Sequence, residues 1–265
     1  MGKLSIGKAW EESVAFVARE STLLLPVALL FVALPSLMLE QLMPPGLSAW
    51  LQAGGEGAMP PVPLGFWAGA LMSMILMWFG SLALFALALR PGISVGEALR
   101  LSIARLPVLI GAALLIMAGI FALVLLVALV AVMLASLSKP LGAAVVALFS
   151  TALVVAAFFG GVRMILLNPV IIDGTMGVRM SILRAWHLTQ GHFWRLLAFL
   201  VLLLMLLAIV SSAAQTVVGV LAGIVAGPAT AKLAGGIAGA LVTTLVQLYM
   251  LVMIARLYRQ AQDAA

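Results

Sequence analysis

The sequence predicts an all-α, polytopic membrane protein, and two observations lead to that prediction. First, 65% of the 265 residues are hydrophobic and only 8% are charged, with a mean hydropathy of +1.29. A soluble domain needs a charged exterior and cannot bury so much apolar surface. Second, the apolar residues occur in runs long enough for a helix to cross the hydrocarbon core, which takes about 20 residues.

Six such runs follow one another in a single membrane domain that covers residues 1–265. The predicted transmembrane helices lie at 22–41, 66–89, 106–134, 141–163, 193–211 and 236–256. The third is long enough to tilt or bend in a bilayer. Between the first two spans, a stretch rich in Pro and Gly predicts an exposed loop.

One further apolar segment, residues 214–236, fits no simple span. The sequence leaves open whether it crosses the bilayer, enters and leaves as a re-entrant segment, or forms a helical excursion. A seventh span would move Arg256 and Arg259 to the opposite side, which favours the excursion. Three of its glycines share a helix face that permits close packing within the fold or, less favoured, an oligomer contact. They are Gly219, Gly223 and Gly227.

The basic residues predict the orientation of the chain. Of the 14 Lys and Arg residues, only Lys139 and Lys232 lie in the alternate loops. The others lie at the N-terminus, around 90–105 and 163–195, and in the C-terminal tail. Basic residues stay on the cytoplasmic side, so both termini are predicted in the cytoplasm. The net charge of +6 then reflects topology, and the expected partners are membrane lipids rather than nucleic acid.

Three short segments resemble one another. They read "SIGKAWEES" (5–13), "SVGEALRLS" (94–102) and "SILRAWHLT" (181–189), with Ser first, Ala fifth and a hydroxyl residue last. Each places apolar residues on one stripe at helical spacing. The sequence therefore predicts three repeated units, at about 1–90, 91–176 and 177–265. Each unit would be an interfacial amphipathic helix followed by a transmembrane hairpin.

The predicted interfacial helices have further local signals. Ser94 and Glu97 have the spacing of a capping box, which predicts a helix start there. Trp10 and Trp186 are expected at headgroup level, with the apolar stripes sunk toward the acyl boundary and the basic residues over anionic lipid.

The segment "MILLNPVIIDGTMGVRMSILRAWHLTQGHFWRLLAFLVLL" (164–203) resembles the membrane domain of some bacterial glycerophosphoryl diester phosphodiesterases and of related stand-alone multi-pass proteins. The resemblance implies the six-span plan with interfacial helices over nearly the whole chain. It also marks a candidate motif of Ser181, Trp186, Thr189, Gly191, Trp194 and Arg195. Pro169 and Asp173 fit the same pattern, although glutamate is more usual at position 173. The phosphodiesterase reaction belongs to a separate barrel domain, for which this chain has no room.

The sequence predicts no catalytic, cofactor-binding or metal-binding residues. Cysteine is absent, which excludes thiolate sites, and no two carboxylates have the spacing of an acid–base pair. His187 and His192 are five residues apart and off a common helix face. Four polar residues are predicted at membrane depth, where placing a polar side chain costs free energy. They are Arg163, Asn168, Asp173 and Gln247.

These polar residues allow two interpretations. The favoured one is a structural corner, formed by a break in the helix in the stretch after Arg163, that anchors the third interfacial helix. The other is a cytoplasm-facing cavity around Arg163, Asn168 and Asp173, in which Arg163 pairs with Asp173. The leading hypothesis is accordingly a non-enzymatic protein that organises lipids or a protein partner, including a second copy of itself. The alternative is a transporter of small solutes or lipids. An intramembrane enzyme would rest only on His187, His192 and Asp173.

Overall fold

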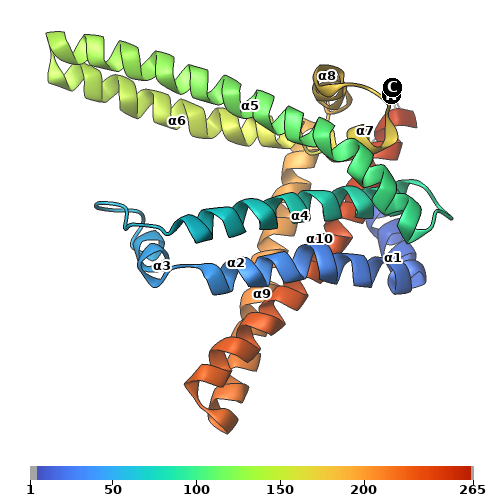
Figure 1. The fold of residues 1–265 in the computed structure, drawn as a ribbon. Coiled ribbons are helices and arrows are strands. Elements are labelled where there is room, and N and C mark those ends of the chain that lie inside the picture. The colour runs from blue at the N-terminus through green and yellow to red at the C-terminus, as the bar shows by residue number, and fades with distance from the viewer. Residues whose placement is uncertain (1–4, 264–265) are drawn as a thin grey trace.

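The computed structural model describes residues 5–263 (except the Leu137 side chain) as helices joined by short turns, with no strand in that range. Three hairpin arms diverge from one end of the molecule (Figure 1). The elements in chain order are α1 (Ile6–Ala28), the π-helical turn η1 (Leu29–Ala33), α2 (Leu34–Leu42), α3 (Pro45–Gln52), α4 (Leu64–Leu89), α5 (Val95–Leu137), α6 (Lys139–Arg163), α7 (Leu167–Asp173), α8 (Val178–Leu188), α9 (Phe193–Ala226) and α10 (Pro228–Asp263).

The prediction of an all-α polytopic membrane protein is confirmed. Within the described residues, 6 helices are long and apolar enough to cross a membrane, and each contains one of the predicted spans. The first arm pairs the continuous α1–η1–α2 span with α4, the second pairs α5 with α6, and the third pairs α9 with α10 (Figure 1). The loop predicted between the first two spans contains a short helix, α3. It begins with Pro45 in the first turn, where a backbone N–H would have no partner within the helix.

The helices are longer than the predicted spans. Helix α5 has 43 residues, which corresponds to about 65 Å at 1.5 Å per residue. That is about twice the thickness of a hydrocarbon core. One end of α5 must therefore protrude from the bilayer or the helix must tilt strongly.

Residues 214–236 are helical and add no seventh span within residues 5–263, as the favoured interpretation predicts. Helix α9 continues through Ala226 and α10 begins at Pro228, so this segment forms the far end of the third arm. The chain reverses at Gly227, whose φ of +86° is readily adopted by glycine. Gly219 and Gly223 pack against Ala231 of α10, so these two glycines serve close packing within the fold.

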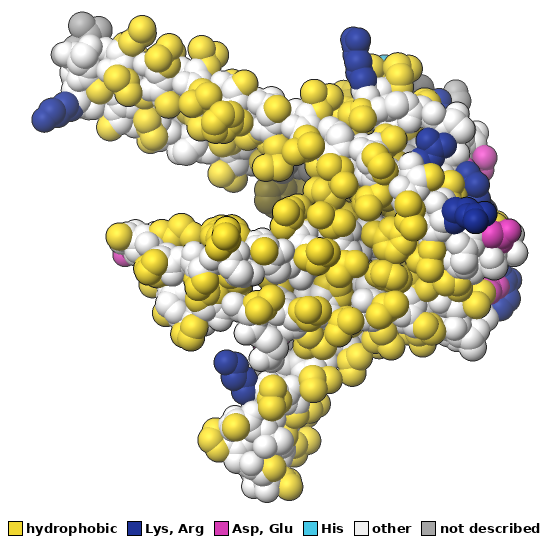
Figure 2. Space-filling view, viewed as in Figure 1, with side chains coloured by type: hydrophobic (Ala, Val, Ile, Leu, Met, Phe, Trp, Pro, Cys, Tyr) yellow, Lys and Arg dark blue, Asp and Glu magenta, His cyan; other side chains and the backbone are white. Residues whose placement is uncertain are grey.

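The core lies where the arms meet. Every residue of α4 from Leu82 to Leu89 is buried, and α1, α5, α7 and α10 all pack against this helix. The far parts of the arms make few contacts outside their own hairpins. Only 6% of the most apolar 18-residue stretch of α5 is buried. Their exposed apolar side chains match a lipid environment, where no charged exterior is needed (Figure 2).

Gly80 of α4 allows close approach of the first-arm helices. A Cβ at this position would overlap the Cβ of Phe31 and lie 3.2 Å from the Phe31 carbonyl oxygen in η1. We expect Gly80→Ala to lower the free energy of unfolding by about 1 to 3 kcal/mol, because the helices must separate. Thermal unfolding in detergent measures the loss. Gly119→Ala in α5 is the control, since a Cβ there meets nothing within 4 Å. Equal melting temperatures for the two variants would contradict this account.

Candidate functional site

Charged residues gather at the end of the molecule from which the arms diverge (Figure 2). We name this end, formed by residues 5–20, 85–105, 163–195 and 253–263, the basic end. It holds the start of α1, the start of α5, and all of α7 and α8, next to the last turns of α10 (Figure 1). The three similar segments therefore lie at the same end of the structure.

The three segments share a local geometry. Their alanines, Ala9, Ala98 and Ala185, are all fully buried. The hydroxyl residue four positions later is also fully buried in each and donates a hydrogen bond back to that alanine's carbonyl oxygen. The oxygen–oxygen distances are 2.6 Å for Ser13, 2.8 Å for Ser102 and 3.1 Å for Thr189. A buried hydroxyl satisfied within its own helix can face a neighbouring helix without an unpaired polar atom.

The direction of the predicted apolar stripes needs a correction. We expected these stripes to sink toward the acyl chains, but they pack on the protein's own core. Buried or partly buried members of that core are Ile6, Ala9, Val17, Val95, Ala98, Leu99, Leu106, Val178, Ile182, Ala185 and Phe193. Trp10 is 43% exposed and stacks on Tyr249 of α10, with ring centroids 6.0 Å apart. An apolar stripe has the same periodicity whether lipid or protein covers it, so the sequence pattern could not show which of the two covers these helices.

Only the third segment forms a separate helix. The capping box at Ser94 is confirmed, since Ser94 and Glu97 each accept a hydrogen bond from the other's backbone N–H. From there α5 continues without interruption into the membrane span, and α1 does so with a kink at Glu20. Helix α8 instead ends at Leu188, and Gly191, with a φ of +79°, turns the chain into α9.

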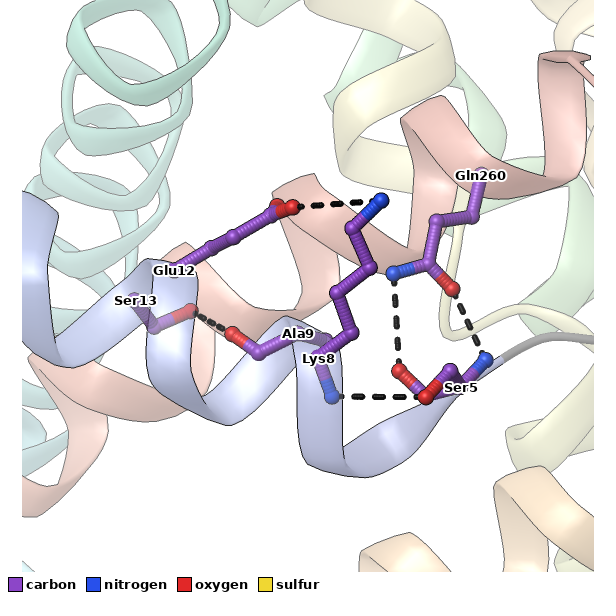
Figure 3. A network of polar contacts seen from close by, with 6 residues as sticks. All are labelled: Ser5, Lys8, Ala9, Glu12, Ser13 and Gln260. Carbon is purple, nitrogen blue, oxygen red and sulfur yellow. Dashed lines mark hydrogen bonds and ion pairs between the residues drawn. The ribbon is translucent and has the colours of Figure 1, made fainter.

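The last turns of α10 connect the other elements of the basic end. Gln260 binds both backbone groups of Ser5: its Oε1 accepts from the Ser5 N–H at 2.9 Å, and its Nε2 donates to the Ser5 carbonyl at 3.4 Å (Figure 3). The neighbouring Arg259 donates to the carbonyl of Leu89 at the end of α4. These two contacts hold the first and fourth helices to the last one.

A carboxylate completes this network. Asp173, at the end of α7, accepts hydrogen bonds from the Tyr258 hydroxyl at 3.0 Å and from Gln262 Nε2 at 3.3 Å. Sequence reasoning missed Tyr258, Arg259, Gln260 and Gln262 and treated the tail only as an orientation signal. The signal available was a run of polar side chains at the end of an apolar helix.

The pairing of Arg163 with Asp173, which belongs to the less favoured cavity interpretation, is wrong. No ion pair joins them in the described part of the chain, where Asp173 binds Tyr258 and Gln262 instead. The Arg163 guanidinium lies over the rings of Phe159 and Trp186, at 5.1 and 5.2 Å from their centroids. Its Nε and Nη1 atoms are buried without a hydrogen-bond partner among the described residues. Aromatic faces therefore stabilise this guanidinium, where the less favoured cavity interpretation placed a carboxylate.

The other polar residues at depth are also separate from one another. The chain breaks after Arg163, as expected, and α7 begins at Leu167. Asn168 lies 3.5 Å from the Ser81 hydroxyl of α4, and Gln247 makes no hydrogen bond in the range 5–263. The cross-helix bond near Gln247 is made instead by Ser211 and Thr243, whose oxygens are 2.8 Å apart. The transporter alternative stays a prediction.

The candidate motif divides into a buried and an exposed part. Ser181 and Thr189 are buried and bonded to backbone carbonyls, and Trp186 is half-buried. Trp194 is 78% exposed, and Arg195 beside it is exposed as well. His187 is exposed, while His192 Nδ1 lies 3.1 Å from the carbonyl of Gln190. The histidines and Asp173 thus make separate contacts, and the described residues contain no cluster of three potential metal ligands.

Four of the exposed arginines at the basic end are Arg100, Arg179, Arg184 and Arg195. We name them the arginine patch. They come from α5, α8 and α9, and within residues 5–263 none of them makes an ion pair or a side-chain hydrogen bond. By contrast, exposed Lys8 and Arg19 of α1 pair with Glu12 and Glu20. The arginine patch therefore carries charge that the described protein does not neutralise.

Comparison of the chain with protein-family models, with curated proteins and with solved structures finds no match.

The hydrogen bond between Tyr258 and Asp173 yields a stability prediction. Tyr258→Phe should lower the free energy of unfolding by about 1 to 2 kcal/mol, because it removes a donor to a carboxylate. Thermal unfolding of the full chain in detergent measures the loss. Tyr249→Phe is the matched control, since Tyr249 is partly buried on the same helix but makes no hydrogen bond among the described residues. A loss of the same size in both variants would refute the role of this hydroxyl.

Proposed function

We propose that the protein is a non-enzymatic component of a bacterial inner membrane that organises anionic phospholipids at its basic end. The arginine patch is the observation that supports this function most directly. Guanidinium groups form bidentate contacts with phosphate, and each basic residue near a membrane surface contributes about 1 kcal/mol of attraction to anionic lipid.

The neighbours of the patch support a position at the membrane surface. Exposed Met180 and Leu183 lie on α8 between the arginines, and exposed Trp194 starts α9. Tryptophan favours the headgroup level because its ring is apolar and its N–H is polar. Of the Lys and Arg residues in the range 5–263, all but Lys139 and Lys232 lie at this end, and the positive-inside rule favours a cytoplasmic position for it.

We also propose that the three similar segments are copies of one module. The matching burial of Ala9, Ala98 and Ala185, with a hydroxyl hydrogen bond to each, supports this proposal. Each module docks its apolar stripe on the common core and directs its charged face outward. This arrangement would give the protein a rigid platform on which lipid-facing arginines are held. The family resemblance found in the sequence fits the same plan.

Removal of arginines from the patch tests the lipid function. In nanodiscs of phosphatidylglycerol and phosphatidylcholine, Arg184→Gln/Arg195→Gln should retain anionic lipid about tenfold more weakly, since two phosphate contacts are lost. Native mass spectrometry of the full chain counts the retained lipids.

Lys8→Gln/Arg19→Gln is the matched control for this experiment. It removes the same charge from the same end, but each residue already has a glutamate partner. We expect the control to retain anionic lipid nearly as well as the unmodified chain. If the two double variants lose the same amount, only net charge matters and the arginine patch is not a lipid site.

A further inference from the structure

A large cavity lies far from the basic end. It has a volume of about 910 Å³ and separates the first arm from the third (Figure 2). Its walls come from α2, α3, α4 and the first turns of α10. None of the residues of the arginine patch or of the α10 tail contributes to it. Its chemistry is therefore independent of the function proposed above.

The cavity walls carry one negative and one positive group on facing helices. Glu40 lies near the end of α2, and its carboxylate rests against Gly236 of α10, where an added Cβ would lie 3.5 Å from Oε1. Lys232 lies one helical turn before Gly236 on α10. In the described residues, neither side chain has an ion pair or a hydrogen bond, and the two do not pair with each other. Both are free to bind a ligand.

The helix ends favour opposite charges at these two positions. Lys232 lies just past the first turn of α10, and the N-terminus of this helix favours an anion such as phosphate. Glu40 precedes the C-terminus of α2, where the dipole favours a cation. A ligand that carries both an anion and a cation therefore fits the cavity better than a ligand of one sign, which one of the two side chains would repel.

The remaining lining residues narrow the ligand class further. Among the residues that the structure describes, no aromatic side chain lines the cavity, so none of them forms the cage that favours a quaternary ammonium. A primary ammonium instead donates hydrogen bonds to a carboxylate. Leu37, Met77 and Ile237 provide an apolar wall, which fits an acyl chain. Ser36, Ser48 and Gln52 add hydroxyl and amide groups.

We propose that this cavity binds a phospholipid whose headgroup joins a primary ammonium to a phosphate, as in phosphatidylethanolamine. Glu40 receives the ammonium, Lys232 binds the phosphate, and the apolar wall covers an acyl chain. A free headgroup such as phosphoethanolamine shares the charged chemistry but lacks the chain. The lipid is favoured because the cavity lies between helices whose outer faces are apolar.

Lipid titration tests the proposal. The delipidated full chain in detergent is titrated with phosphatidylethanolamine or with phosphatidylcholine, and bound lipid is counted by native mass spectrometry. We expect one tightly bound phosphatidylethanolamine and weaker binding of phosphatidylcholine. Glu40→Gln and Lys232→Gln keep side-chain size and should each weaken phosphatidylethanolamine binding by about tenfold to a hundredfold, since each removes a charged hydrogen bond.

Matched variants control for charge and folding. Glu56→Gln and Lys139→Gln remove the same charges away from the cavity lining and should leave binding unchanged. Glu40→Lys should invert the preference and favour phosphatidylglycerol over phosphatidylethanolamine. Circular dichroism and size-exclusion chromatography verify the fold of each variant.

Three outcomes would overturn the proposal. Equal binding of phosphatidylethanolamine and phosphatidylcholine would show that the ammonium is not recognised. Binding that is unchanged in both Glu40→Gln and Lys232→Gln would place the lipid elsewhere. Isothermal titration with free phosphoethanolamine tests whether the ligand is the lipid or its free headgroup. An affinity equal to that of the lipid would assign the cavity to a soluble ligand. None of these results depends on the arginine patch, so the function proposed for the basic end is tested separately.

Discussion

Apolar side chains gain little when they leave lipid for another apolar helix, so helix association in a membrane depends on close packing and polar contacts. In this chain the hydrogen bonds of the α10 tail, which join distant elements, lie at the basic end. Three buried alanines let helices approach there, and a buried hydroxyl in each segment bonds within its own helix. Farther from this end, most residues of α5 and α6 in the second arm are not buried by the rest of the protein. The three arms therefore share a base and diverge beyond it (Figure 1).

The end of α10 makes this base a single unit. Through Gln260, Arg259 and Tyr258 it binds Ser5, the end of α4 and Asp173 of α7, three points that are distant in sequence. Charged side chains not needed for these contacts stay free, and they form the arginine patch. The opposite end differs in chemistry, since the cavity there exposes one carboxylate and one ammonium. The molecule thus presents a basic surface at one end and a zwitterionic pocket toward the other, which fits the different lipid contacts that we propose for each.

Span number and helix starts were predictable because both depend on local chemistry. Runs of apolar residues identify the helices that cross a membrane, and the spacing of Ser94 and Glu97 identified a capping box. Contacts between distant residues were not predictable in this way. Arg163 and Asp173 are close in sequence and opposite in charge, yet the break after α6 separates their partners. Arg163 covers two aromatic rings, and Asp173 bonds to Tyr258, which lies 85 residues later in the chain.

The sequence by itself determined that this protein is a helical membrane protein, how many helices are long enough to cross, and where its charges concentrate. Those properties follow from composition and from short-range periodicity. Only the tertiary structure decided that the apolar stripes of α1, α5 and α8 face the core rather than lipid, and that Glu40 and Lys232 share a cavity. The physical reason is that lipid and protein cover an apolar surface equally well, so the pattern of a helix does not specify which of them its neighbour is.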